Sequence, residues 1–372
     1  MRIGIDAQFA AYERRGVGRY IACLVRGLAT ADTQNQYYIY GPRKAFPELE
    51  SAPNFSIREV GNIPYPIWEQ CMLPQWARRD QLDLLHSPAN TAPLRLPLRT
   101  RLLITVHDVM YLLPPKLLPR PLAWRQRLGN AYRKWIVPAA VRRADGLLAV
   151  SNFTKQQVVD LLRADPSTIQ VVYEGIEMPA DLPRESPSDA YILALGAHDP
   201  RKNTARIIEA YAQLRRSGKI REKLVIVGLR NWQSSPFLNL ARKLRIEKDI
   251  LFRDYVSDAE LVDCYAAARC LLYPSLYEGF GLPPLEAMAQ GTPVIASAVT
   301  SIPEIAGDAA WYVDPHSTDS IKDGLLRLLQ DECLRSTLIA KGRAQAARFT
   351  WENTVAGTLQ AYNGLHEENA RR

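Results

Sequence analysis

The chain has 372 residues, of which 47% are hydrophobic and 23% charged, so its length predicts two domains and its composition is typical of globular proteins. These values exclude a mostly disordered chain, a collagen-like repeat and a coiled-coil rod. The 47 Lys and Arg residues against 39 Asp and Glu residues give a net charge of +8, which indicates an anionic partner without identifying it.

The start of the chain and its cysteines favour a cytoplasmic protein. The sequence begins Met-Arg-Ile-Gly-Ile-Asp, without the apolar run of a signal peptide, and no apolar stretch of about 18 residues predicts a membrane-spanning helix. The five cysteines are odd in number and include no C-x-x-C pair, which favours reduced thiols over disulfides or a zinc site. We therefore expect a cytoplasmic location and no metal ligands.

In the first half of the chain, short apolar runs alternate with amphipathic helical patterns. The spacing predicts a strand over 2–6, a glycine turn at 16–18 and a helix over 17–29. Ser151 is a predicted N-cap for a helix that ends near Leu162. Further strands are predicted over 37–40, 56–60, 83–86, 102–106, 147–150 and 169–172. Repeated β-then-α units of this kind predict a parallel sheet with helices on both faces.

A proline-rich segment over 173–189 interrupts the pattern and predicts a linker. A second β-then-α series follows, in which Ser257 is a predicted N-cap. Its strands are predicted over 191–195, 223–227, 250–252, 270–273 and 293–296, and its helices over 203–216, 258–268, 282–290, 317–329, 332–348 and 351–365. The fold class is therefore α/β, with two doubly wound, Rossmann-like domains whose ligands bind at the carboxyl ends of the strands.

The most informative motif is the stretch over 275–296, which reads S-L-Y-E-G-F-G-L-P-P-L-E-A-M-A-Q-G-T-P-V-I-A. Gly279 and Gly281 allow a ligand to approach the backbone closely, and the helix that two prolines open after them is an anion site. Glu278 lies in the loop and Glu286 about one turn into the helix, and carboxylates accept hydrogen bonds from sugar hydroxyls. A phosphate flanked by sugars is the predicted ligand. A solvated glutamate beside a capped structural helix is the alternative.

A second motif, L-G-A-H-D-P-R-K-N, follows the first strand of the second series. Its Arg201 and Lys202 open a helix at a position suited to a diphosphate, because charge-assisted contacts to phosphate are among the stronger polar interactions. A solvated basic pair is the alternative. The expected position beside the Glu278 loop, at one edge of the sheet, favours the phosphate.

Two features of the first domain are expected at the carboxyl ends of its strands. The G-x-G of Gly16 and Gly18 lacks the third glycine of a dinucleotide fingerprint, and Asp32 precedes the second strand instead of ending it, so the motif is a weak NAD signal. His107 ends a strand, and the Asp108 beside it is expected to hold the ring in one orientation. This histidine is predicted to bind a sugar or to transfer a proton, with a structural histidine as the alternative.

On these residues the chain resembles retaining glycosyltransferases of family 4, which have the GT-B fold of two Rossmann-like domains. The resemblance rests on the E-x7-E spacing from Glu278 to Glu286 with E-G-F-G, and on P-R-K-N, V-S-D at 256–258, G-V-G-R-Y, V-H-D and the ending F-T-W-E. It implies an N-terminal acceptor domain over 1–180, with a helix over 351–372 that crosses back to it, and a C-terminal donor domain over 188–350.

The resemblance also implies roles for individual residues. The catalytic residues would be His107, near the C6 hydroxyl of the sugar, with Glu278, Lys202 and Arg201. The implied nucleotide-sugar site comprises Gly16, Gly18, Gly196, Arg201, Lys202, Tyr255, Val256, Glu278, Gly279, Phe280, Gly281, Leu282 and Glu286, with the base near Tyr255 and the ribose at Glu286. Some relatives carry a basic residue where this chain has Ala197, and its absence leaves more of the phosphate charge to Arg201 and Lys202.

The implied reaction is transfer of a glycosyl group with retained configuration. Because the chain has no Asp-x-Asp, we expect a metal-independent enzyme without a cofactor, in which protein cations and a helix N-terminus stabilise the leaving diphosphate. The V-H-D-V-M-Y-L and R-G-V-G-R-Y segments resemble bacterial mannosyltransferases of polysaccharide and O-antigen assembly, which favours GDP-mannose as donor and a lipid-linked saccharide as acceptor.

Several alternatives stay open. UDP-glucose, UDP-N-acetylglucosamine or a nucleotide-rhamnose could be the donor. An NAD-dependent oxidoreductase and a basic nucleic-acid-binding protein are the alternatives from other classes. No helix-turn-helix, RRM or zinc pattern supports the last of these, so we expect no nucleic-acid partner.

The positive charge is concentrated over residues 84–144, which contain eleven Lys and Arg residues and a single acid, Asp108. Trp124, Tyr132 and Trp135 are interleaved with these cations, a pattern that suits an anionic membrane surface. The alternative is a solvated basic helix whose aromatic residues pack inward. We therefore expect peripheral association with the inner face of the plasma membrane.

Overall fold

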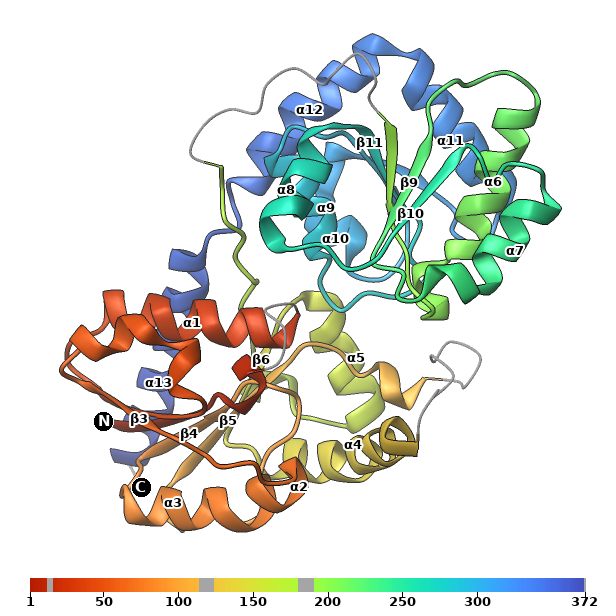
Figure 1. Cartoon of the computed structure of the whole chain (residues 1–372). Coiled ribbons are helices and arrows are strands. Elements are labelled where there is room, and N and C mark those ends of the chain that lie inside the picture. Colours follow the sequence, from red (N-terminus) through yellow and green to blue (C-terminus); the bar gives the residue numbers. More distant parts are fainter. Residues whose placement is uncertain (12–15, 114–123, 180–190, 371–372) are drawn as a thin grey trace. The chain divides into compact units, whose positions relative to one another are not determined.

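The computed structural model describes residues 1–11, 16–113, 124–179 and 191–370, which form two compact units (Figure 1). Among the described residues, unit 1 contains Met1–Leu112, the segment from Trp124 to Gly175 and the segment that begins at Thr350, and unit 2 contains Ile176–Phe349. Each unit is a parallel sheet with helices on both faces, so the predicted α/β class and the doubly wound topology are confirmed.

Unit 1 is built on a seven-stranded parallel sheet in the order β3-β2-β1-β4-β5-β6-β7. Buried Ile, Leu and Val side chains dominate its central strands, as expected for a parallel sheet that is covered on both faces. The strands are β1 (Arg2–Asp6), β2 (Gln36–Tyr40), β3 (Phe55–Arg58), β4 (Leu84–Ser87), β5 (Arg101–Val106), β6 (Gly146–Ala149) and β7 (Ile169–Val171).

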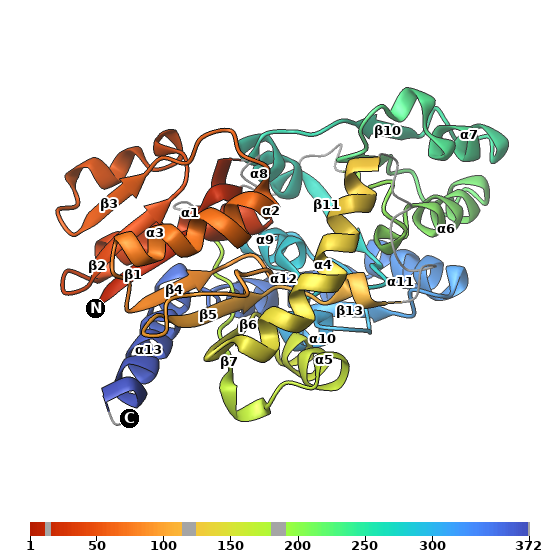
Figure 2. The ribbon, with the colours of Figure 1, turned by 90° about the horizontal axis from the view of Figure 1, so that it is seen from below.

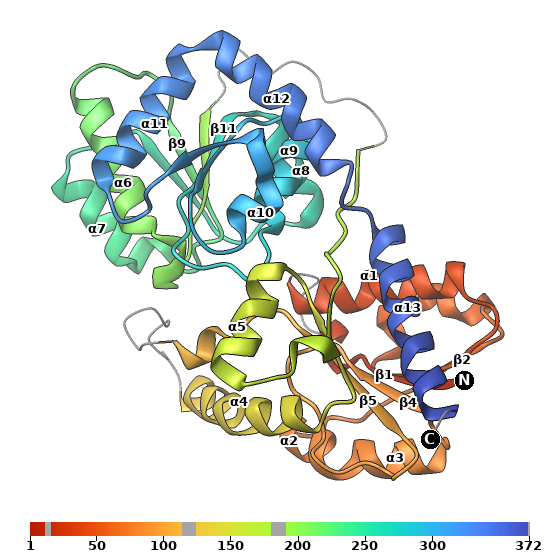
Figure 3. The same ribbon diagram turned by 180° about the vertical axis from the view of Figure 1, so that it is seen from behind.

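Two sets of helices cover the faces of this sheet. Helices α3 (Leu73–Arg79), α4 (Trp124–Arg143) and α5 (Asn152–Leu162) pack on one face (Figure 2). Helix α1 (Val17–Ala31) and the C-terminal helix α13 (Trp351–Ala370) pack on the other, where they contact each other (Figure 3). Short elements complete the unit: η1 (Gln8–Ala11), η2 (Arg43–Ala45), η3 (Pro47–Ser51), α2 (Tyr65–Ile67), the π-helical turn η4 (Trp68–Met72), η5 (Met110–Leu112) and η7 (Pro166–Thr168).

Unit 2 has a six-stranded parallel sheet in the order β10-β9-β8-β11-β12-β13. Its strands are β8 (Tyr191–Leu195), β9 (Leu224–Val227), β10 (Ile250–Arg253), β11 (Ala268–Tyr273), β12 (Val294–Ser297) and β13 (Ala310–Val313). Its helical elements are η8 (Pro200–Lys202), α6 (Thr204–Arg216), η9 (Trp232–Ser234), α7 (Pro236–Lys243), α8 (Asp258–Ala266), α9 (Leu282–Ala289), α10 (Ile302–Ala306), η10 (Gly307–Ala309), α11 (Thr318–Gln330) and α12 (Glu332–Ala346).

The strand order reverses once in each sheet, between β1 and β4 in unit 1 and between β8 and β11 in unit 2. At such a switch point the connections leave in opposite directions, and the crevice outside the carboxyl ends of the two strands is where ligands bind doubly wound sheets. The residues that follow β1 and β4, and those that follow β8 and β11, are therefore where the site should lie in each unit.

Most predicted elements are confirmed to within a few residues, including the Ser151 cap and a full capping box at Ser257. Gly291, just after α9, has a φ of 74°, the left-handed conformation that glycine favours at the end of a helix. The sequence patterns missed strand β13 and four helical segments, α2, α3, α7 and α10. Each of these helices has a proline in its first positions, and each is too short to show a clear helical period.

Candidate active site

In unit 2, the switch point brings the two predicted motifs into direct contact. Lys202 ends η8 after β8, and Glu278 lies in the loop after β11, the neighbouring strand. The Nζ atom of Lys202 lies 2.8 Å from Oε1 of Glu278, with their side chains only 23% and 15% exposed. The predicted proximity of the basic pair and the Glu278 loop is therefore confirmed.

Three donors converge on the same oxygen of Glu278. Besides Lys202, the hydroxyls of Tyr273 (2.7 Å) and Ser275 donate to Oε1. Burial raises the pKa of Glu278, but the charges of Lys202 and Arg201 and these hydrogen bonds outweigh it and hold the pKa below its usual value. Glu278 is therefore a carboxylate at neutral pH. Within the described residues its other oxygen, Oε2, has no hydrogen-bond partner, so it is free to accept one from a ligand hydroxyl.

Both cations of the basic pair have carboxylate partners of their own. Arg201 forms a two-pronged ion pair with Asp199 through Nε and Nη2. Lys202 donates to Glu278 and, over 2.7 Å, to the hydroxyl of Tyr273, which leaves the third hydrogen of its ammonium group for a ligand. The sequence motif indicated the two cations but not their partners, Asp199 and Tyr273.

Backbone contacts hold the two loops together. The backbone N–H of Leu276, in the Glu278 loop, donates to the carbonyl oxygen of Arg201 over 2.7 Å, and the hydroxyl of Ser275, whose one hydrogen is directed to Glu278, lies 3.0 Å from the same carbonyl. Asn203, buried and in the left-handed region with a φ of 58°, donates to the carbonyl oxygens of Pro274 and Pro315. These bonds fix η8 against the start of the Glu278 loop, so the Lys202–Glu278 contact does not depend on a ligand.

The remaining predicted residues of unit 2 lie along the same strand ends. Glu286, on α9, accepts a hydrogen bond of 3.0 Å from the hydroxyl of Tyr265, which orients it and which the sequence analysis missed. Gly281 has a φ of 123°, and a Cβ there would lie 2.9 Å from Ile302, so the turn into α9 requires glycine. A Cβ at Gly196 would lie 2.4 Å from a side-chain carbon of Ile226.

The residues proposed for the base lie after β10, two strands from β8. Tyr255 is 48% exposed, and the guanidinium of Arg230, which follows β9, stacks on its ring with 4.4 Å between Cζ and the centroid. Arg230 was not predicted as a site residue, and the one sequence signal that could have indicated it is its position just after a predicted strand. The candidate donor residues thus follow four neighbouring strands, β10, β9, β8 and β11.

In unit 1, His107 follows β5 with both ring nitrogens engaged. Nδ1 lies 2.8 Å from a carboxylate oxygen of Glu174 and Nε2 lies 2.9 Å from the carbonyl oxygen of Pro88. Nε2 therefore donates to the carbonyl oxygen of Pro88, and with Glu174 ionised Nδ1 donates as well, which makes the ring an imidazolium. Burial lowers the pKa of His107, but the hydrogen bond and charge of Glu174 and the carbonyl of Pro88 raise it above its usual value.

The expectation that Asp108 orients this histidine is wrong. Asp108 accepts instead from the backbone N–H of Met110, and the acid at the ring is Glu174. Glu174 belongs to the segment predicted as a linker, where no regular pattern marked it as a buried residue. As an imidazolium His107 supplies positive charge, whereas a role as proton acceptor requires it to give up one of its two bonds.

Gly16 of the glycine turn lies just before α1 and has a φ of 56°. Gly18 lies in the first turn of α1 and is buried. The basic residues Arg14 and Arg15 of this motif lie outside the described residues. The functional roles assigned to the site residues of both units stay predictions, because the structure fixes their geometry and not their activity.

Comparison with known proteins places the chain in a family. Residues 14–178 match the family model "Glycosyltransferase Family 4", and residues 182–345 match "Glycosyl transferases group 1". The chain is similar to the O-antigen chain mannosyltransferase B of Escherichia coli, with 31% identity over an alignment of 393 residues that covers 98% of this chain and 100% of the relative. The O-antigen chain mannosyltransferase RfbU of Salmonella typhimurium is 28% identical over 69% of this chain and 68% of its own.

Solved structures share the fold. Sucrose-phosphate synthase from Thermosynechococcus elongatus superposes with a TM-score of 0.76 and 21% identity over 99% of this chain and all of its own. WaaG, a glycosyltransferase involved in lipopolysaccharide biosynthesis, superposes with a TM-score of 0.69 and 18% identity over 97% of this chain and 98% of its own. With two doubly wound units and the E-x7-E loop in contact with the basic pair, the chain belongs to glycosyltransferase family 4 and has the GT-B fold.

Proposed function

We propose that this glycosyltransferase moves an α-mannosyl group from GDP-mannose to a lipid-linked glycan, with retained configuration and without a divalent metal ion. The observation that carries the proposal is the contact of Lys202 with Glu278 at the switch point of unit 2, which sets a phosphate-binding cation beside a sugar-binding carboxylate. The full-length similarity to a relative named as an O-antigen mannosyltransferase supports mannose as the transferred sugar.

In the proposed reaction, the bond between C1 of the sugar and the diphosphate oxygen breaks while the acceptor oxygen bonds to C1 on the same face. The acceptor proton passes to an oxygen of the leaving diphosphate, so GDP and the extended glycan are the products. Arg201 and the third ammonium hydrogen of Lys202 stabilise the charge that develops on the diphosphate. Glu278 accepts from a hydroxyl of the sugar through Oε2, and Glu286, held by Tyr265, accepts from the ribose.

A panel of nucleotide sugars tests the donor. We expect GDP-mannose to raise the melting temperature of the protein more than GDP, UDP-glucose, UDP-N-acetylglucosamine or dTDP-rhamnose do at the same concentration. We also expect slow hydrolysis of GDP-mannose, faster than that of the other nucleotide sugars. Equal hydrolysis in EDTA and in Mg²⁺ supports the metal-independent reaction, and loss of turnover in EDTA overturns it. A UDP- or dTDP-sugar preference would overturn the donor while leaving the transferase intact.

We further propose that unit 1 docks on an anionic membrane through α4. Leu128 and Trp135 are 59% and 68% exposed, and their seven-residue spacing places them on one face of the helix with the exposed cations Arg127, Lys134 and Arg142. Trp135 therefore faces solvent, whereas Tyr132 packs inward on Glu69 and Gln70, as the alternative predicted for the aromatic residues, and the side chain of Trp124 lies outside the described residues. Within the described residues no helix is long and apolar enough to span a membrane.

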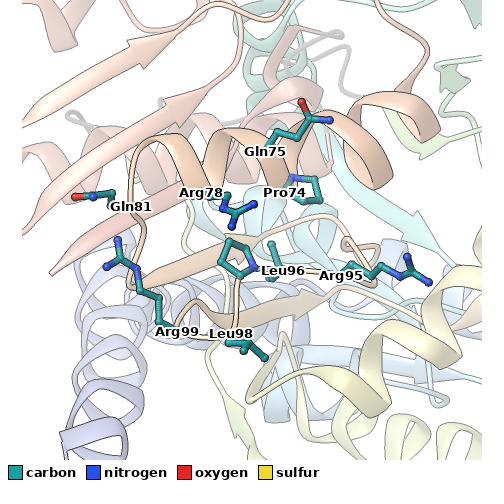
Figure 4. Close-up of a pocket in the computed structure, with 9 residues that line it drawn as sticks. Pro74, Gln75, Arg78, Gln81, Arg95, Leu96, Leu98 and Arg99 are labelled. Carbon is teal, nitrogen blue, oxygen red and sulfur yellow. The ribbon is translucent and has the colours of Figure 1, made fainter.

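A groove of about 740 Å³ beside α3, on the face of the sheet that α4 also covers, adds to this surface (Figure 4). Arg78, Arg95 and Arg99 line it, and no side chain in the described parts of the chain pairs with them. The fully exposed Leu98 lies between the last two. Unpaired arginines beside an exposed apolar residue are suited to phosphate headgroups at a membrane surface.

Vesicle sedimentation tests the docking. We expect binding to vesicles that contain an anionic phospholipid and not to neutral vesicles, with a clear loss in Trp135→Ser and in Arg95→Gln. Leu251→Ser is the matched control, because Leu251 is 45% exposed on β10 of unit 2. Equal binding to neutral vesicles would overturn the anionic headgroup as the partner, and unchanged binding by Trp135→Ser would show that this face of α4 is merely solvated.

A further inference from the structure

At the carboxyl end of β1, two buried carboxyl groups meet across a single phenol. Asp6 ends β1 and is 2% exposed, and Glu69 lies in η4 and is fully buried. The hydroxyl oxygen of Tyr65, on α2, lies 3.0 Å from Oδ2 of Asp6 and 3.0 Å from Oε1 of Glu69. Both distances are those of hydrogen bonds.

If both acids are ionised, there are too few hydrogens for both contacts of Tyr65 to be hydrogen bonds. A phenol has one hydrogen, so Tyr65 donates to one carboxyl group only. The second contact is a hydrogen bond only if the other carboxyl group is protonated and donates to the phenol oxygen. Otherwise a buried carboxylate oxygen faces a lone pair at 3.0 Å, an arrangement that is costly away from water.

Glu69 has the donors that a carboxylate needs. Its Oε2 accepts from Nε2 of Gln70 over 2.7 Å and from the hydroxyl of Tyr132, on α4. With the hydrogen of Tyr65 on Oε1, both oxygens of Glu69 are satisfied. Glu69 is therefore the member of the pair that is better stabilised as an anion.

Asp6 is the better site for the proton. Its Oδ1 accepts long hydrogen bonds from Nε1 of Trp68 (3.2 Å) and from the backbone N–H of Gln8 (3.3 Å). Within the described residues its Oδ2 contacts only the phenol of Tyr65, so a hydrogen on Oδ2 completes the series from Asp6 to Tyr65 to Glu69. Burial and the charge of Glu69 raise the pKa of Asp6 to about 7, in the same direction.

This cluster lies where the chain leaves β1 for the glycine turn. Asp6 is followed by η1, whose Phe9 contacts the ring of Tyr65 with 4.5 Å between centroids, and the turn at Gly16 follows η1. Thr91, after β4 on the other side of the switch point, has its hydroxyl 3.5 Å from that of Tyr65.

The titratable groups that pack against Asp6 thus come from three elements: Tyr65 on α2, Glu69 in η4 and Tyr132 on α4. The charged residues after η1, residues 13–15, lie outside the described residues.

We propose that Asp6 and Glu69 share one proton through Tyr65, and that this proton positions η1 and the glycine turn for glycosyl transfer. The three side chains are positioning residues and do not contact the reacting atoms in this account. The link to transfer rests on the proposed function, whereas the shared proton does not. When the proton leaves, two buried carboxylates face one phenol, and the resulting repulsion acts at Asp6, where β1 joins η1.

Thermal unfolding of the whole chain as a function of pH tests the proton. The folded pKa of Asp6 is raised above its ordinary value, so the folded state binds the extra proton and stability falls as pH rises through about 7. Asp6→Asn and Glu69→Gln each replace one acid with a neutral amide of the same size. We expect each to flatten the fall in melting temperature between about pH 5 and pH 8, relative to the wild type.

Asp32→Asn is the matched control, because Asp32 is also a buried acid of unit 1 and accepts from Tyr37 (2.6 Å), Asn35 (2.6 Å) and Gln34 (2.8 Å). Burial raises the pKa of Asp32, but these bonds lower it below its usual value, so its variant should lose stability without flattening the pH dependence. An unchanged pH dependence in both Asp6→Asn and Glu69→Gln would show that no proton is shared.

The pH profile of transfer tests the positioning role. We expect the KM for GDP-mannose hydrolysis in the wild type to rise severalfold on the alkaline side, because the glycine turn belongs to the implied nucleotide-sugar site, and Glu69→Gln to remove this rise. Tyr65→Phe should raise the KM at every pH, because it removes the bridge. The same alkaline limb in Glu69→Gln and wild type overturns the positioning role. If no nucleotide sugar is hydrolysed at all, the proposed function fails while the unfolding experiment still decides the shared proton.

Discussion

The Lys202–Glu278 pair allows stability and transfer to be separated by mutation. Lys202→Met leaves the carboxylate of Glu278 only 15% exposed and without its cation, and breaking a buried pair in this way costs about 3–5 kcal/mol. The hydroxyls of Tyr273 and Ser275 still donate to Glu278, so we expect a loss at the lower end of this range. In Lys202→Met with Glu278→Gln no charge is left unpaired, and most of the stability should return.

In the double variant, glycosyl transfer should not be restored together with stability. Without Lys202 the leaving diphosphate loses one fixed cation, and removing one such stabilising group costs about 10²–10³ in kcat. We expect the double variant to melt near the wild type and to hydrolyse GDP-mannose about 10²-fold more slowly or worse. The assays are thermal unfolding and donor hydrolysis on the same three preparations. A double variant that regains both stability and turnover would show that the pair is structural and that our placement of the diphosphate is wrong.

Three further outcomes follow from the geometry. Glu174→Gln should lower the pKa of His107, seen by NMR titration, because the paired carboxylate is what raises it; an unchanged titration would show that Glu174 is not the cause of the raised pKa. Gly281→Ala should cost about 1–3 kcal/mol of stability in denaturant unfolding, because its φ of 123° is unfavourable for any residue with a Cβ. Tyr265→Phe should raise the KM for the donor severalfold with little change in melting temperature, since Glu286 loses the hydroxyl that orients it; an equal change for Tyr191→Phe, whose hydroxyl contacts a backbone carbonyl, would point to a general packing effect.

The candidate site of unit 2 was accessible from the sequence because its residues follow strands directly. Strand β8 is a continuous apolar run and β11 ends in one over 270–273, so their carboxyl ends were placed correctly, and Lys202 and Glu278 follow within a few residues. Doubly wound topology then puts these two loops side by side. The hydrophobic pattern could not predict which side chains hydrogen-bond to Glu278 and Glu286. Tyr273 and Tyr265 are spaced as core residues of a strand and a helix, and only their hydroxyls reach the site.

In unit 1, Glu174 and Glu69 lie in segments whose sequence shows neither a helical nor a strand period. Glu174 lies in irregular chain after β7, and Glu69 in a π-helical turn between two short helices. The prolines near Glu69 break the apolar spacing on which helix prediction depends, so a fully buried acid was not distinguishable from a surface residue. Burial of such acids is decided by tertiary contacts with donors from other elements, as with Tyr132 on α4.

The charges at the donor site are balanced before any ligand arrives, and this has a consequence for selectivity. Arg201 and Lys202 are adjacent cations that would repel each other, and Asp199 and Glu278 compensate for them. A bare phosphate that draws Lys202 toward itself weakens the pairing of Glu278, whose buried carboxylate is costly to leave without partners. A sugar phosphate avoids this cost, because a sugar hydroxyl donates to Oε2 of Glu278 while the phosphate takes the third hydrogen of Lys202. We therefore expect the compensated pair to favour a phosphate that carries a sugar over one that does not.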